Sequence, residues 1–160
     1  MSMTTSRATA DCVQVLWMWT QSTPDTVPRA RKALRCALDQ LGCNDEVISD
    51  SLIVASELIT NAVEHAPGPY ELRLRRTESV LICEVVDGDP QIPDVVVHPA
   101  VDLFEPPPEA RGGGSTALLK VLSEGGRGLQ VVDQLTCGAW GFKARRCDGS
   151  KTAWAVIYGV

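Results

Sequence analysis

The sequence lacks the features that mark membrane and secreted proteins. None of its apolar runs reaches the roughly 18 residues that a bilayer-spanning helix requires. The first residues, MSMTTSRATADC, contain one arginine and no apolar core, so we expect no secretory signal peptide. The six cysteines form neither a CxxC pair nor a zinc-site spacing. These absences favour a protein of the reducing cytoplasm.

Positive charge is also scarce. Fifteen Lys and Arg stand against twenty Asp and Glu, which gives a net charge of −5. The densest basic cluster, Arg73 with Arg75 and Arg76, alternates along a predicted strand and does not form a stripe that could neutralise phosphates. We therefore expect no direct contact with nucleic acid or membrane. The 160 residues and 44% hydrophobic content predict one globular domain over residues 1–160, with a flexible N-terminus over 1–11.

Hydrophobic periodicity predicts one strand and two helices in the first part of the chain. Residues 12–20 are β-rich and apolar on both faces, which is typical of a strand. Residues 25–41 follow the helical period, with Thr26 as the expected N-cap and Gly42 as the stop. Asn44 can cap a second helix that runs to residue 65 or 66, because the following Pro-Gly-Pro cannot continue it.

The rest of the chain predicts strands around a long irregular segment. Strands are expected at 70–76 and 80–86, a helix from about Arg127, and further strands at about 136–142 and 152–158. Residues 87–126 are rich in Pro and Gly, which indicates a functional lid or a disordered segment with a helical turn or two at 116–123. Strands and helices do not alternate regularly. We therefore expect an α+β two-layer sandwich, with a mixed, mostly antiparallel sheet and helices on one face.

Polar side chains recur along one side of the predicted second helix, in the stretch SELITNAVEHAPG. Glu57 and Asn61 are four residues apart and so share a face, with Cβ atoms about 5–6 Å apart. A carboxylate at that place suits a general base, and a carboxamide oxygen suits Mg²⁺. The alternative is an ordinary solvated helix side.

Three other short motifs each allow two interpretations. Asp87 in VVDGDP ends a strand and could accept a hydrogen bond from the exocyclic amine of a purine, although Asp-Gly-Asp-Pro is also ordinary turn chemistry. The stretch GGRGL at 125–129 enters a helix, where free amides suit a phosphate, but a flexible hinge explains it equally well. GSKT at 149–152 is not a P-loop, because a strand follows it.

Taken in order, the segments SELITNAVEHA, VVDGDP, GGRGLQVVDQL and GSKTAWAVI resemble the Bergerat-fold (GHKL, histidine-kinase-like) ATPases over about residues 25–158. More narrowly, they resemble the small anti-sigma-factor serine/threonine kinases of bacteria. The resemblance implies a layered sandwich with the nucleotide pocket on the helical side of the sheet. It also implies that residues of about 88–125 form an ATP lid.

The resemblance further implies roles for individual residues. Glu57 would be the general base for the attacking hydroxyl, Asn61 would coordinate Mg²⁺ at the phosphates of ATP, and Asp87 would accept the adenine amino group. The remaining binding positions implied are Gly126, Arg127, Gly128 and Leu129 at the phosphates, and Thr152 near the adenine end.

Three functions remain open from the sequence. The leading hypothesis is a kinase that phosphorylates a small antagonist (anti-anti-sigma) protein and alternately sequesters a sigma factor. The second is a non-catalytic, ATP-gated adaptor, and the third is an α/β domain that binds no nucleotide. Relatives commonly form homodimers, and the apolar first strand could serve as such an interface, although a core strand is the expected role.

Overall fold

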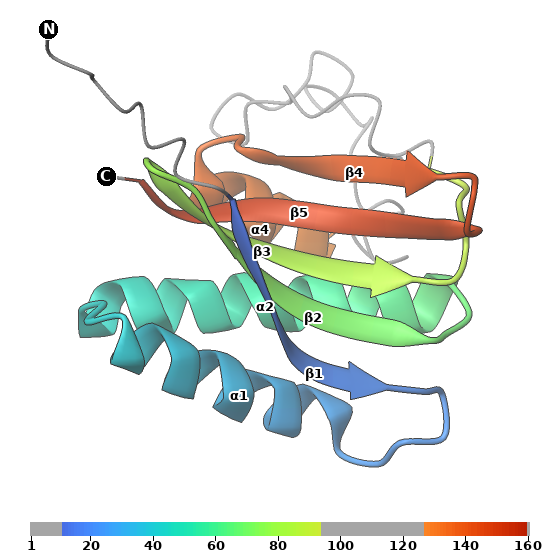
Figure 1. The fold of residues 1–160 in the computed structure, drawn as a ribbon, viewed down its shortest axis with the longest axis horizontal. Coiled ribbons are helices and arrows are strands. Elements are labelled where there is room, and N and C mark those ends of the chain that lie inside the picture. Colours follow the sequence, from blue (N-terminus) through green and yellow to red (C-terminus); the bar gives the residue numbers. More distant parts are fainter. Residues whose placement is uncertain (1–10, 94–126, 160) are drawn as a thin grey trace, which may run out of the picture.

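The computed structural model describes residues 11–93 and 127–159. Within these ranges the chain forms one five-stranded sheet and three helices, shown in Figure 1. Most of the predicted lid, the predicted helical turn at 116–123, Gly126 and nearly all of the N-terminal segment lie outside the described residues.

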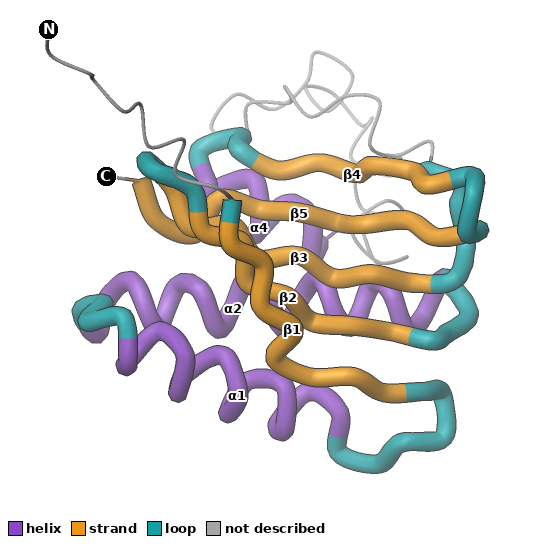
Figure 2. The backbone as a smooth tube through the Cα atoms, in the orientation of Figure 1, coloured by secondary structure: helices purple, strands orange, loops and turns teal. Residues whose placement is uncertain are grey.

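The sheet has the strand order β1-β2-β3-β5-β4, and all four neighbouring pairs are antiparallel. The predicted α+β fold, with a largely antiparallel sheet and helices on one face, is confirmed. Figure 2 shows the helices of the described residues on one side of the strands, and none of these helices covers the other side of the sheet. The strands are β1 (Cys12–Trp19), β2 (Tyr70–Arg76), β3 (Val80–Asp87), β4 (Trp140–Arg145) and β5 (Ser150–Gly159).

The two long helices follow the sequence pattern closely. They are α1 (Thr26–Gln40) and α2 (Asp45–His65), and the Asn44 carboxamide caps α2 by accepting from the Val47 N–H at 2.9 Å. The expected cap of α1 was wrong by one residue. Asp25 is the N-cap, with a left-handed φ of 53°, and the Thr26 hydroxyl donates backwards to the Thr23 carbonyl at 3.1 Å.

The helix α4 (Arg127–Thr136) follows the undescribed segment and runs further than expected. A strand was predicted from residue 136, but Thr136 is the last helical residue, and its buried hydroxyl donates to the Val132 carbonyl at 2.7 Å. Cys137 and Gly138 then take left-handed backbone angles, and the Gly138 N–H closes the helix on the Asp133 carbonyl at 3.0 Å. The strand β4 therefore begins only at Trp140.

The hydrophobic core lies between the sheet and the helices. Leu34 of α1, Ile59 of α2 and Leu72 of β2 are fully buried there, and the rings of Trp19 and Tyr70 stack at 5.4 Å. The expected core role of the first strand holds at its C-terminal end only, because Val13 and Val15 are exposed. None of the helices in the described ranges combines the length and the apolar character needed to cross a bilayer.

Candidate functional site

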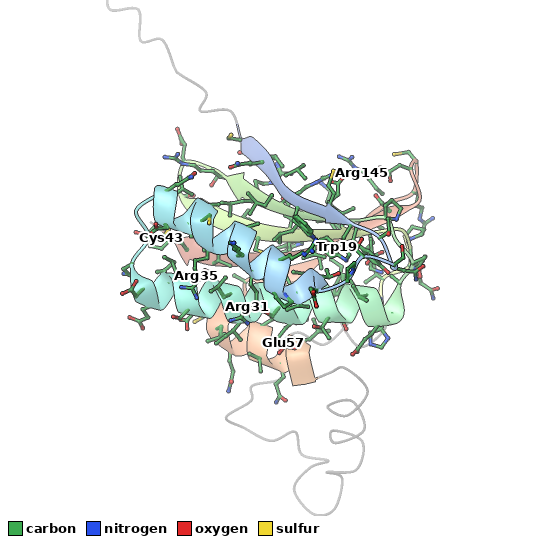
Figure 3. All side chains as sticks on the ribbon, turned by 90° about the horizontal axis from the view of Figure 1, so that it is seen from below. Trp19, Arg31, Arg35, Cys43, Glu57 and Arg145 are labelled. Atoms are coloured by element: carbon green, nitrogen blue, oxygen red, sulfur yellow. The ribbon has the colours of Figure 1, made fainter. Side chains whose placement is uncertain are left out.

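The polar side of α2 faces the first turn of α4. Figure 3 places Glu57 on the helical side of the sheet, next to α4, whereas Arg145 lies on the opposite side. A Cβ atom built on Gly128 would collide with the Glu57 carboxylate, so the glycine is what allows this close approach. The structure therefore brings together the predicted base and the predicted phosphate-binding glycine, which are 71 residues apart in the sequence.

Asn61 lies one helical turn after Glu57 on α2 and is half-buried. Residues four apart lie on the same side of a helix, so its carboxamide and the Glu57 carboxylate share one side of α2. The pair therefore provides a carboxylate, from Glu57, and a neutral carboxamide oxygen, from Asn61, on the side of α2 that meets α4 at Glu57.

Asp87 is the last residue of β3, and its side chain is buried at 3% exposure. One carboxylate oxygen accepts from the Asp89 N–H at 2.9 Å, and the other lies 3.2 Å from the Lys151 ammonium. Burial raises the pKa of Asp87, and the Asp89 N–H and the Lys151 charge act in the opposite direction. The carboxylate is thus held in one orientation, pointing to the helix-covered side where Val85 and Ala153 also lie.

The end of α2 is fastened to the turn that carries Asp87. The Gly88 N–H donates to the Pro67 carbonyl at 2.8 Å, and a Cβ atom at Gly88 would collide with the Gly68 carbonyl. The buried Tyr70 hydroxyl donates to the Ala66 carbonyl at 2.6 Å. Glycine at position 88 therefore serves a close backbone approach, and the Asn61 and Asp87 regions are fixed relative to one another.

Lys151 is a further residue of this site, one that the sequence motifs did not predict. It lies within the GSKT segment, is only 4% exposed, and pairs with Asp87 across the ladder between β3 and β5. Its ammonium also donates to the Gln91 carbonyl at 3.2 Å. Lys151 lies on the same face of β5 as Ala153, which is buried in the core. No signal in the sequence predicted this placement, because small and apolar residues follow one another in β5 without a clear alternation.

Thr152 and Asp87 border the same concave pocket, but their side chains leave the β3–β5 ladder on opposite faces of the sheet. The register partner of Thr152 is Val86, and successive residues of a strand point to opposite faces, so Thr152 lies on the uncovered face of the sheet. On that face Thr152 lines an open pocket with a volume of about 610 Å³, together with Trp154, Arg75 and Glu84. Its predicted role near the adenine stays a prediction, and this register does not support it.

The other predicted phosphate-binding positions surround the start of α4. Gly126 lies outside the described residues, and Arg127 is the first residue of the helix. The Leu129 side chain is 7% exposed and packs into the core, so only its backbone amide is available to a ligand. The first amides of a helix have no partner inside the helix, which makes this turn a suitable place for an anion.

Within the described ranges, no three His, Cys, Asp or Glu side chains cluster as a metal site. The curated proteins provide no match to the chain. A family model described as "Histidine kinase-like ATPase domain" matches residues 20–138, which is most of the sequence and includes Glu57, Asn61, Asp87 and Gly128. The chain therefore belongs to the histidine kinase-like ATPase domain family, a class of ATP-binding domains.

Proposed function

We propose that this chain is a protein serine/threonine kinase that uses Mg-ATP to phosphorylate a small antagonist protein, and that it sequesters a sigma factor when the antagonist is absent. The family match supports ATP binding in general terms. The observation that carries the finer proposal is the position of the Glu57 carboxylate, which lies against the first turn of α4, one helical turn before Asn61.

Each residue of this arrangement has a distinct task in the proposal. Asp87 accepts the amine of the adenine ring, and the first amides of α4 near Gly128 hold phosphate oxygens. Glu57 then removes the proton from the serine or threonine hydroxyl of the partner as the hydroxyl attacks the terminal phosphorus. The bond from that phosphorus to the bridging oxygen breaks, and ADP is released. Positioning and charge neutralisation supply most of the rate in such transfers.

Asn61 fits a magnesium-binding role by its chemistry. Mg²⁺ in nucleotide sites is commonly held by one or two protein oxygens, with the substrate phosphates and water completing its shell. The half-buried Asn61 carboxamide is one such oxygen donor, placed one turn from Glu57. The ion would neutralise charge on the phosphates, and Asn61 would orient it.

The sharpest test separates chemistry from binding with the variant Glu57→Gln. We expect it to bind ATP within about threefold of the native chain but to lose at least 100-fold in transfer to the partner, in line with the loss of a general base. The matched control is Glu64→Gln on the same helix, where the side chain is exposed. The partner is recovered by pull-down with and without Mg-ATP, and the transferred phosphate is located by mass spectrometry.

A second variant tests the contact between α2 and α4. Gly128→Ala places a methyl group against the end of the flexible Glu57 side chain, which must then move. We expect an unfolding free energy within about 1 kcal/mol of native, since only a side-chain end is displaced, together with a drop in phosphoryl transfer of about tenfold or more. Native transfer rates in Gly128→Ala would contradict the role of this contact.

The ATP-gated adaptor predicts a different outcome in the same assays. Calorimetry would show ATP binding and the pull-down would recover an ATP-dependent partner, yet no phosphosite would form and Glu57→Gln would behave as native. That result would overturn the kinase proposal. A native chain without any ATP affinity would overturn both.

A further inference from the structure

A buried ion pair lies at the end of the helix-covered face of the sheet. Asp87 closes β3 and Lys151 lies opposite it near the start of β5, with 3% and 5% of their side chains exposed. Removing two charges from water costs free energy, and a stabilising core does not need such a pair. Its position between apolar neighbours such as Val85 and Ala153 suggests a task other than stabilisation.

Lys151 reaches a second acceptor, on the chain that leaves β3. Its ammonium donates to the Gln91 carbonyl at 3.2 Å, four residues after Asp87. An ammonium has three donors and no acceptor, so it can hold both oxygens at once. The turn between them is closed by the Asp89 N–H bond to Asp87 and by the Gln91 N–H bond to Asp89, each at 2.9 Å.

We propose that Lys151 is a positioning residue of the nucleotide site, which holds the Asp87 carboxylate in the orientation that accepts the purine amine and ties it to the start of the segment after β3. This inference rests on the proposed adenine contact of Asp87 and adds a residue to that site. Lys151 acts through Asp87, so its removal weakens recognition of the 6-amino group rather than binding of the phosphates.

The competing explanation is that the pair only stabilises the fold. The two explanations differ in what a second substitution does. A purely structural lysine would affect ADP and inosine diphosphate equally, because the two ligands differ only at the 6-position and N1 of the purine, where inosine has a carbonyl and an N1–H in place of the amine and an unprotonated N1. A positioning lysine would affect ADP alone and would lose its effect once Asp87 no longer accepts.

The experiment is a double-mutant cycle measured by calorimetry with ADP and with inosine diphosphate. The variants are Lys151→Met, Asp87→Asn and the combination, with Lys143→Met as a control on β4, where the lysine is exposed. We expect Lys151→Met to weaken ADP binding about tenfold or more and to leave inosine diphosphate within about twofold. In the Asp87→Asn background we expect Lys151→Met to change ADP affinity by less than twofold.

The pH dependence of ADP affinity gives a second test, because a purely structural role of Lys151 would not change that dependence. The charged and titratable groups around Asp87 are Lys151 on β5, Asp89 in the turn and Tyr70 on β2. Without the lysine, burial raises the pKa of Asp87 further, because the opposing charge is gone. The ratio of native to Lys151→Met affinity for ADP should therefore widen as the pH falls from about 8 to 5.5, while the ratio for inosine diphosphate stays constant.

The possible failures can be told apart. If the native chain binds no ADP, the proposed function fails and this inference fails with it. If the native chain binds ADP but Lys151→Met matches it, or loses ADP and inosine diphosphate equally, only the inference is overturned. Should Lys151→Met not fold, Lys151→Arg and Lys151→Gln take its place, with arginine expected to restore preference for ADP and glutamine expected not to.

Discussion

The two faces of the same sheet carry ion pairs of the same kind in different surroundings. On the helix-covered face, Asp87 and Lys151 pair across β3 and β5 with both side chains almost fully buried. On the uncovered face, Arg75 pairs with Glu84 across β2 and β3, where the arginine is 31% exposed and the carboxylate 7%. Arg73 bonds Glu71 nearby at 2.6 Å.

This difference in burial indicates which of the two ion pairs belongs to a functional site. The uncovered-face pairs belong to a charged surface, in which Arg75 also approaches Asp11 at 3.7 Å and solvent reaches most members. The covered-face pair lies at the edge of the apolar core, where the end of α2 meets the turn after β3, and its polar contacts include Asp89 and Gln91 of that turn. Burying a charge pair is expensive, so its presence at that place needs a functional reason more than the surface pairs do.

The largest expected contrast between the faces is in packing. Leu72→Ala on the covered face removes a fully buried side chain and should lower the free energy of unfolding by about 2–5 kcal/mol. Val15→Ala on the uncovered face, where the side chain is 47% exposed, should change it by less than about 0.5 kcal/mol. Urea unfolding measures both, and equal losses would contradict the assignment of the faces.

A second contrast concerns the two ion pairs. Glu84→Gln removes the charge that Arg75 bonds, and we expect a loss of about 1–3 kcal/mol in unfolding free energy. Because this pair lies on the face away from the proposed nucleotide contact, ADP affinity should remain native. A parallel loss of ADP affinity in Glu84→Gln would show that the two faces are coupled.

A smaller effect is expected at the junction of α2 and β2. Tyr70→Phe removes the 2.6 Å hydrogen bond to the Ala66 carbonyl and leaves that oxygen without this donor, at a cost of about 1 kcal/mol. Tyr158→Phe is the matched control, because Tyr158 is 40% exposed. Thermal unfolding of the two variants gives the comparison, and an equal shift would argue against the Ala66 bond as the cause.

Thiol labelling of the native protein probes the covered face without any mutation and is the mildest of these tests. Burial raises the pKa of the Cys83 thiol to about 12, so almost no thiolate exists at pH 8. The exposed Cys36 should react with a thiol reagent in the native protein, whereas Cys83 should react only at the rate of unfolding. Mass spectrometry of labelled peptides separates the two, and fast native labelling of Cys83 would contradict a closed covered face.

Local patterns in the sequence were good guides to the elements and poorer guides to their ends. The helix from residue 45 to 65 was predicted almost completely, because Asn44 caps it and Pro67 stops it through local chemistry. The start of β4 was misplaced because Thr136 is a good strand residue by preference, yet its hydroxyl bonds back to Val132 within α4. Tertiary contacts decided that boundary.

The α+β fold and the candidates Glu57, Asn61, Asp87 and Gly128 could be predicted from the sequence alone, because motif order and helical spacing are local properties of the chain. Two contacts became visible only in the folded chain: Gly128 against the Glu57 carboxylate, and Lys151 against Asp87. They depend on tertiary packing and on strand register, which also places Thr152 on the other face of the sheet. A shift of one residue in the pairing of β3 with β5 exchanges the two faces of β5, and no local pattern around residues 149–152 fixes that pairing.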